Sequence, residues 1–249
     1  MRWWLGWCLG LLAAAAALGQ PRSFVACPVV RDTKTVPCFL AEYEGETYFL
    51  GVQGDITSEF HPPQLKHEVL VEGRVAEGPR ICGGIPLRPI SISVRKEVNL
   101  ACNTLLPAEP GIEAPPTPRG AGPASRRLEE GSATRPPRTG RQEFKLLFAF
   151  DDDYVDYAAN QAVTEAAAYA QQIHASSVKV SGYRATSLLS NGQRLVEKAG
   201  LAEQRAQAVG ALLRGLGVPA VSVEWKSDAE PADGQSDPSR RLVAVTVSP

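Results

Sequence analysis

Histidine, aromatic side chains and catalytic signature motifs are all scarce in this sequence of 249 residues. The three histidines, His61, His67 and His174, offer little material for a catalytic triad or a histidine-rich metal site. There is no Walker A loop, no dinucleotide fingerprint and no G-x-S-x-G motif. We therefore predict that the protein is not an enzyme and needs neither a metal nor a cofactor.

The sequence also has almost no net charge and no unusual composition. The formal net charge is −1, which argues against nucleic acid as a partner because nucleic-acid binding generally needs a basic field. Hydrophobic residues make up 44% of the chain and charged residues 21%, as in ordinary globular proteins. The length suits one large domain or two small ones.

The first 19 residues have the pattern of a secretory signal peptide. Arg2 is followed by an uninterrupted apolar run from Trp3 to Leu18, and Ala17 and Gly19 place small residues before a cleavage site. A retained membrane anchor is the alternative, but the run is shorter than the roughly 20 residues that a span needs. We predict an exported chain that begins near Gln20.

Four cysteines remain after signal removal, and all lie before residue 103. An even set in an oxidising compartment predicts two disulfides. Three pairings are possible, and we favour the two that close local loops. A zinc site is weakly supported because no Cys-x-x-Cys pair is present, and acylation of the first cysteine would leave an odd thiol. The favoured pairs are Cys27–Cys38 and Cys82–Cys102.

Residues 24–106 are predicted to form a small all-β domain. Short alternating or apolar runs bounded by Gly and Pro predict five strands, and the disulfides would support a modest core. A small closed barrel, OB-like in form, is the favoured architecture, with a sandwich as the alternative. The expected strands cover residues 37–43, 47–52, 67–75, 80–82 and 90–94.

Residues 107–142 differ in composition from what precedes and follows them. Eight prolines and six arginines occur among these 36 residues, with very few aliphatic side chains. Such a segment buries too little apolar surface to offset its ordering entropy, so it is predicted to be a disordered linker.

Residues 143–249 are predicted to fold as a second, α+β domain with the order βαβαββ and its helices on one face. Strands are expected at 144–150, 178–183, 221–225 and 242–247, and helices at 156–173 and 201–216. Three aspartates, Asp151 to Asp153, precede the first helix and are interpreted as capping residues, with a metal-binding triplet as the alternative.

A charged residue, Arg205, lies on the apolar stripe of the second predicted helix, between Leu201 and Val209. A charge on such a stripe costs free energy unless something pairs with it. The function therefore depends on whether Arg205 pairs with the protein itself or with a ligand.

Several motifs of the second domain resemble those of the OmpA-like C-terminal domain, a periplasmic module by which many Gram-negative envelope proteins hold peptidoglycan. The similar segments are F-A-F-D at 148–151, V-K-V-S-G-Y at 178–183, L-A-E-Q-R-A at 201–206 and R-R-L at 240–242. The resemblance covers about 105 residues, and it implies a periplasmic protein, associated with the outer membrane as a further option.

The resemblance also implies a binding site for the diaminopimelate of the peptidoglycan stem peptide. In that family an aspartate takes the ammonium group and an arginine takes the carboxylate. Arg205 matches the arginine, Gly182 and Tyr183 would shape the pocket wall, and Arg241 would support it. Ala185 stands at the aspartate position.

The segment that follows departs from the family in two further ways. Lys198 replaces an asparagine, and the segment between the strand and the helix is about five residues longer. Asp151 to Asp153 or Glu197 could substitute for the missing carboxylate, or an acidic side chain could hold Arg205 internally.

Three hypotheses follow. The first is an exported envelope protein whose OmpA-like domain contacts peptidoglycan through Arg205. The second is the same fold used as a protein-interaction module after loss of that site. The third is an enzyme of the first domain that uses Glu42 and Glu72, two residues more simply explained as solvent-facing strand positions.

Overall fold

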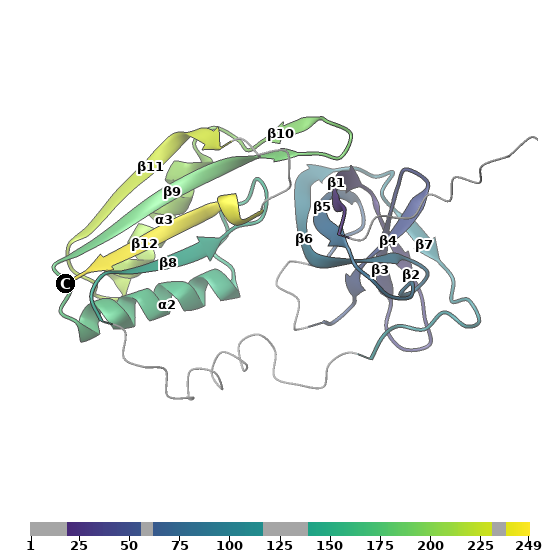
Figure 1. The fold of residues 1–249 in the computed structure, drawn as a ribbon, viewed down its shortest axis with the longest axis horizontal. Helices are drawn as coiled ribbons and strands as arrows, with labels where there is room; N and C mark the ends of the chain where they lie inside the picture. Colours follow the sequence, from purple (N-terminus) through teal and green to yellow (C-terminus); the bar gives the residue numbers. More distant parts are fainter. Residues whose placement is uncertain (1–18, 56–61, 117–138, 231–237) are drawn as a thin grey trace, which may run out of the picture.

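A computed structural model describes residues 19–55, 62–116, 139–230 and 238–249. The described chain forms two sheets and two helices, arranged as two units side by side (Figure 1). The predicted signal peptide and most of the predicted linker lie outside the described residues. No helix within the described ranges is long and apolar enough to span a membrane.

The first unit is a seven-stranded sheet with the order β1-β5-β6-β4-β3-β2-β7. The predicted hairpin forms as β3 and β4, and the strand predicted at 67–75 is β5. The N-terminal strands and the last short strand were not predicted. The bounds are β1 Pro21–Ala26, β2 Pro28–Arg31, β3 Cys38–Tyr43, β4 Glu46–Val52, β5 His67–Val75, β6 Ile85–Val98 and β7 Thr104–Leu106.

The closed barrel expected from the sequence is not confirmed. In the described chain β1 and β7 stand at opposite ends of the strand order, so backbone pairing leaves an open, half-barrel sheet. Two of the five predicted strands also change: residues 80–82 make only an isolated bridge, and 90–94 belong to the 14-residue strand β6.

Strand β5 is buried on both of its faces. Its burial pattern includes four consecutive enclosed residues, Val69 to Glu72. Since successive side chains of a strand point to opposite faces, Val69 and Val71 join the core of the first unit, whereas Leu70 packs with residues of the second unit. The expectation that Glu72 faces solvent is therefore wrong: it is 2% exposed.

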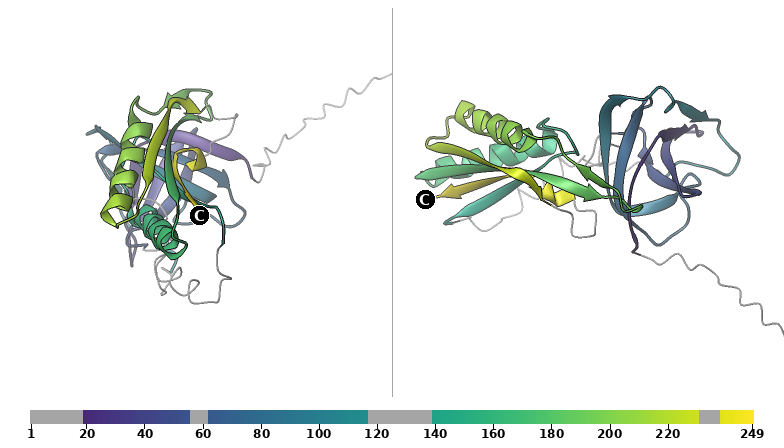
Figure 2. Two further views of the ribbon diagram at one scale, coloured as in Figure 1. Left: turned by 90° about the vertical axis from the view of Figure 1, so that its left-hand side faces the viewer. Right: turned by 90° about the horizontal axis from the view of Figure 1, so that it is seen from above.

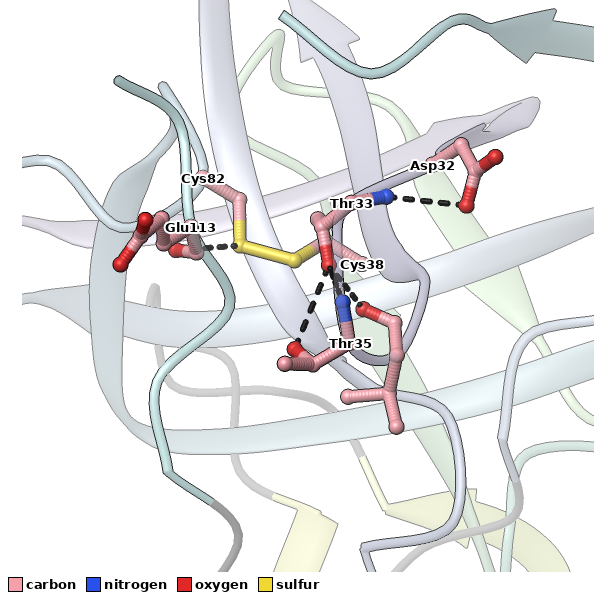
Figure 3. Close-up of a disulfide and its surroundings, with 7 residues drawn as sticks. Asp32, Thr33, Thr35, Cys38, Cys82 and Glu113 are labelled. Carbon is pink, nitrogen blue, oxygen red and sulfur yellow. Dashed lines mark hydrogen bonds between the residues drawn. A yellow bond between two sulfur atoms is a disulfide. The ribbon is translucent and has the colours of Figure 1, made fainter. Parts of the chain in front are cut away.

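The two disulfides join Cys27 to Cys102 and Cys38 to Cys82, so the favoured local pairing is wrong. Parallel pairing of β2 with β7 aligns Val29 with Thr104, which brings the first pair together across a separation of 75 residues. The second pair lies beside Thr33 and Thr35 (Figure 3). Strand pairing between distant segments, which the sequence pattern does not specify, decides the connectivity.

The first part of the predicted linker lies against the first unit. Ile112 and Ala114 pack around the Cys38–Cys82 disulfide, and the Glu113 carbonyl lies 3.7 Å from the Cys82 sulfur (Figure 3). Glu109 forms an ion pair with Arg31 at 3.5 Å.

The second unit has a mixed sheet with the order β10-β9-β12-β8, and β11 pairs in parallel with β9. Both helices cover one face of this sheet (Figure 2). The order βαβαββ is as predicted, with the short β10 as an addition. The bounds are β8 Gln142–Leu147, α2 Tyr157–Gln172, β9 Ser177–Leu188, β10 Arg194–Val196, α3 Leu201–Gly215, β11 Val221–Glu230, η1 Pro238–Arg240 and β12 Leu242–Ser248.

The start of α2 is capped by Asp156, whose side chain accepts a hydrogen bond from the Ala159 backbone N–H at 2.7 Å. The expectation that Asp151 to Asp153 cap this helix is therefore wrong. All three precede the helix, which begins at Tyr157, and Asp151 lies in a turn with a positive φ of 58°.

Candidate functional site

Arg205 lies in the second turn of α3 and is completely enclosed, with 0% exposure. Its apolar helix stripe forces the side chain into the interior, where its guanidinium lies 4.9 Å from the centre of the Phe148 ring. All five of its N–H groups donate hydrogen bonds within the chain. The acceptors are the carbonyls of Ala149, Asp152 and Tyr183 and both carboxylate oxygens of Glu197.

The carboxylate of Glu197 is equally well satisfied. Its two oxygens lie 2.7 Å and 3.0 Å from the terminal nitrogens of Arg205, a bidentate arrangement. Oε1 also accepts from the Asp151 N–H at 3.0 Å, and Oε2 accepts from the Ala185 N–H at 2.7 Å. Because Glu197 is 1% exposed, the pair forms a closed unit with no position open to solvent.

Glu197 lies in the segment that joins β9 to α3. Strand β9 continues to Leu188 and turns back as β10, which places Glu197 beside Ala185 through a backbone hydrogen bond of 3.1 Å. Arg184 donates to the Glu197 carbonyl at 2.6 Å, and the Lys198 N–H donates to Asp151 at 2.7 Å. The segment between β9 and α3 therefore holds an internal carboxylate against Arg205.

Gly182 and Tyr183 lie near Arg205, and each makes a distinct contact. A Cβ atom on Gly182 would be 2.1 Å from the Ala202 carbonyl oxygen, so glycine permits the close packing of β9 on α3. Tyr183 contributes its carbonyl to Arg205 at 3.1 Å, and its ring lies 5.2 Å from the Lys226 ammonium.

Arg241, the fourth expected ligand contact, is also fully buried and pairs with the first unit. It lies between η1 and β12, and its guanidinium donates hydrogen bonds to both carboxylate oxygens of Glu72, at 2.6 Å and 3.1 Å. Ser187 completes the group, since its hydroxyl donates to Glu72 at 2.9 Å and accepts from Arg241 at 3.0 Å. Glu72 and Arg241 are 169 residues apart in sequence.

Backbone groups also join the two units. The Ser23 N–H donates to the Ser190 hydroxyl at 2.9 Å, and the Ser190 N–H donates to the Ser23 carbonyl at 2.7 Å. The Phe150 N–H donates to the Ser93 hydroxyl at 2.8 Å. These bonds fix the tip of the β9–β10 hairpin on β1 and the turn after β8 on β6.

An apolar cluster fills the space around these polar contacts. Leu70 of β5 packs with Phe150 and Leu189 of the second unit, all three buried, and Val25 and Leu195 pack against them. Side chains from both units thus share one small core.

Exposed ion pairs also join the two units. Lys96 pairs with Asp152 at 3.1 Å and with Asp153 at 3.5 Å, and Lys198 pairs with Glu97 at 3.4 Å. Partial burial works to lower the pKa of Lys96, but the two aspartates outweigh it and raise that pKa. The pKa of Glu97 is lowered, first by its own backbone N–H and then by Lys198.

A cleft of about 430 Å³ lies beside this contact and is lined by both units. Pro21, Arg74 and Ile90 line it from the first unit, and Leu147 and Tyr154 from the second. Neither Arg205 nor Glu197 lines the cleft, so this opening does not lead to the arginine that was expected to bind a ligand.

The third hypothesis, an enzyme using Glu42 and Glu72, has no geometric support. Glu42 is exposed on β3, whereas the carboxylate of Glu72 is enclosed by Arg241 and Ser187. Sequence reasoning missed Glu72 as a partner of Arg241. The signal that was available is its place in an apolar run, H-E-V-L-V-E-G, where a carboxylate beside buried residues needs a cation.

Comparison with known proteins agrees with the fold of the second unit. Residues 147–243 match the model of the OmpA family, so this part of the chain is an OmpA-like domain. OmpA-like domains occur in cell-envelope proteins, commonly bind peptidoglycan, and are typically binding or structural rather than catalytic. A search of curated proteins found no match.

The solved structures that are similar to the chain include an OmpA-like domain and a MotB-like protein. The OmpA-like domain of FopA1 from Francisella tularensis subsp. tularensis SCHU S4 is 22% identical, with 43% of this chain and 72% of that chain covered and a TM-score of 0.33. A MotB-like protein from Desulfovibrio vulgaris is 15% identical, with 44% and 76% covered and a TM-score of 0.34.

Proposed function

We propose that this chain is an exported, non-catalytic envelope protein whose OmpA-like domain serves as a protein-interaction module rather than as a peptidoglycan receptor. The observation that carries the proposal is the complete internal use of Arg205. All five of its N–H groups have acceptors within the chain, and Glu197 occupies the bidentate position that a ligand carboxylate would need.

The missing aspartate supports the same conclusion. At Ala185 there is no side-chain carboxylate to take the ammonium group of diaminopimelate, and its backbone N–H is already used by Glu197. Displacing Glu197 would leave Arg205 and the backbone N–H groups of Asp151 and Ala185 without their hydrogen-bond acceptor. A ligand would therefore have to replace four hydrogen bonds before it gained any affinity.

Peptidoglycan contact is the second candidate, and the family match favours it. The Arg205 site does accept a carboxylate, since it already holds that of Glu197. In this alternative the β10 segment would move away and a stem-peptide carboxylate would take the place of Glu197.

Co-sedimentation with purified diaminopimelate-type sacculi tests the proposal. The mature full-length chain is expected to stay in the supernatant at physiological salt, while a peptidoglycan-binding OmpA-like domain in the same tube sediments with the sacculi. Saturable sedimentation of this chain, competed by free stem peptide, would overturn the proposal and favour the second candidate.

A further inference from the structure

We propose that the first unit, residues 19–116, is itself a protein ligand of the OmpA-like domain, residues 139–249. In this proposal Glu72 is the anchor, Arg241 is its receptor, and the recognition does not need the covalent linker. The inference rests on the proposed function in that it names the protein partner of the interaction module.

The position of Glu72 identifies it as an anchor. It lies on the face of β5 that the second unit covers, next to Leu70, and it is 2% exposed. A carboxylate removed from water in this way is stable only when it is paired and hydrogen-bonded. Arg241 and Ser187, both from the second unit, supply these bonds.

Arg241 is fixed in place by its own domain. Its N–H donates to the Pro238 carbonyl at 3.1 Å, and its carbonyl accepts from the Phe148 N–H at 2.9 Å. Its guanidinium lies 5.8 Å from the centre of the Phe150 ring. A cation whose backbone is held in this way, and whose guanidinium lies beside an aromatic ring, is suited to recognise a carboxylate presented by another surface.

The surrounding contacts have the layout of a protein–protein interface. A buried charged pair and an apolar cluster of Leu70, Phe150 and Leu189 occupy the centre, and the exposed pairs of Lys96 and Lys198 form the rim. Binding energy at such interfaces concentrates in a few enclosed central residues, often including arginine.

Within the part of the chain that the structure describes, the hydrogen bonds and ion pairs named here between the two units lie outside residues 107–116 and 139–142. Every hydrogen bond and ion pair between the units described above connects residues 23–97 with residues 149–241. In the proposal, the chain between the two units only raises their local concentration, and the bonds named here hold them together.

Cleavage of the linker tests the proposal on the folded, full-length protein. A specific protease site is placed between residues 117 and 138, the oxidised protein is cut, and the products are analysed by size-exclusion chromatography and by dilution. The two pieces are expected to elute together at the size of the uncut chain. Separation of the wild-type pieces at micromolar concentration would overturn the proposal.

Substitution of the anchor makes the test specific. Glu72→Gln keeps the shape but removes the charge, and it should weaken association of the cut pieces by about 30-fold or more. Glu97→Gln is the matched control, because it removes a glutamate of the same interface at the exposed rim and should change association less than about fivefold. Equal effects of the two substitutions would overturn the role of Glu72.

A second variant keeps the test valid if Glu72→Gln disturbs folding of the first unit. Leu189→Asp places a charge at the hairpin tip, where Leu189 packs in the cluster shared by the two units. It should separate the cut pieces while each keeps its circular dichroism spectrum. The sacculus experiment reads out a different event, so failure of the proposed function and failure of this inference are distinguishable.

Discussion

The guanidinium of Arg205 and the carboxylate of Glu197 form an enclosed bidentate pair, with nitrogen–oxygen distances of 2.7 Å and 3.0 Å. The pair fills the position where the family resemblance places a ligand carboxylate. Arg241 shows the same relationship with Glu72. Both arginines expected to contact a ligand are thus held by glutamates of their own chain.

Removal of Glu197 should leave a vacant carboxylate site that a small anion can fill. Glu197→Ala leaves Arg205 buried without its counter-ion, which should destabilise the protein by about 3–5 kcal/mol. Acetate should restore part of the lost thermal stability, whereas acetamide or chloride at equal ionic strength should restore much less. Thermal unfolding followed by circular dichroism measures the effect.

The control for this rescue is the double variant Glu197→Ala with Arg205→Met, which removes the cation. Acetate should have no specific effect on it, and it should be more stable than Glu197→Ala alone because no unpaired charge remains. Equal acetate rescue in both variants would show that the anion acts elsewhere.

Gly182→Ala should destabilise the OmpA-like domain strongly. The added Cβ would be 2.1 Å from the Ala202 carbonyl oxygen, a backbone atom that cannot move without shifting α3. A loss of at least about 2 kcal/mol is expected, as for other overpacked sites. Chemical denaturation measures it.

Gly215→Ala is the matched control for that substitution. No atom lies within 4 Å of the added Cβ, and the residue ends α3 without a positive φ. Alanine should therefore leave stability unchanged or raise it by up to about 1 kcal/mol. Similar losses at Gly182 and Gly215 would contradict the packing role of Gly182.

The disulfide connectivity can be read directly by peptide mapping. Digestion without reduction should yield peptides that link Cys27 to Cys102 and Cys38 to Cys82. Each bond closes a loop of 44 residues or more, so its removal by a pair of Cys→Ser substitutions should cost about 2–5 kcal/mol. Recovery of a Cys27–Cys38 peptide would contradict the strand order of the first unit.

The rim charges predict a broad pH plateau for association of the cut pieces. The pKa of Glu97 is lowered from an ordinary value of 4.5, first by its own backbone N–H, which stays in the separated piece, and then by Lys198 of the other unit. Only the part that Lys198 supplies contributes to association, and that part is complete above 4.5 and is lost as the pH falls through the lowered pKa. The pKa of Lys96 is raised from 10.5, so its contribution is complete below that value and is lost as the pH rises through the raised pKa.

Association measured between about pH 5 and pH 10 should therefore vary little through these two groups. Glu97→Gln should reduce the decrease of the association constant at acid pH. Lys96→Met should reduce its decrease at alkaline pH. Both effects should be small, because the two side chains are largely exposed. If the association constant of Glu97→Gln decreases at acid pH as much as that of the wild type, another group causes the decrease.

Much of the second unit was predictable from its sequence. An alanine-rich run located the first helix, and helical spacing of apolar residues located the second. Arg205 on the apolar stripe of the second helix identified a buried charge in need of a partner. Glu197 was one of several possible partners in the sequence. Its selection required the β9–β10 hairpin, whose backbone bond between Glu197 and Ala185 is a tertiary feature.

The relation between the two units was not predictable in the same way. Glu72 and Arg241 meet across 169 residues, and nothing in the local pattern of either residue names the other. The same holds for the disulfides, where the parallel pairing of β2 and β7 decides which cysteines meet. Alternation along β5 indicates a strand, but it does not show that both faces of the strand are covered.

The most direct test is a calorimetric titration of the mature, full-length protein with a soluble stem peptide that contains diaminopimelate. If Glu197 occupies the carboxylate site of Arg205, the wild-type protein should show no saturable heat at peptide concentrations up to about 1 mM, equivalent to a binding free energy weaker than about −4 kcal/mol. Saturable binding with one peptide per chain, suppressed by excess free diaminopimelate, would contradict the account.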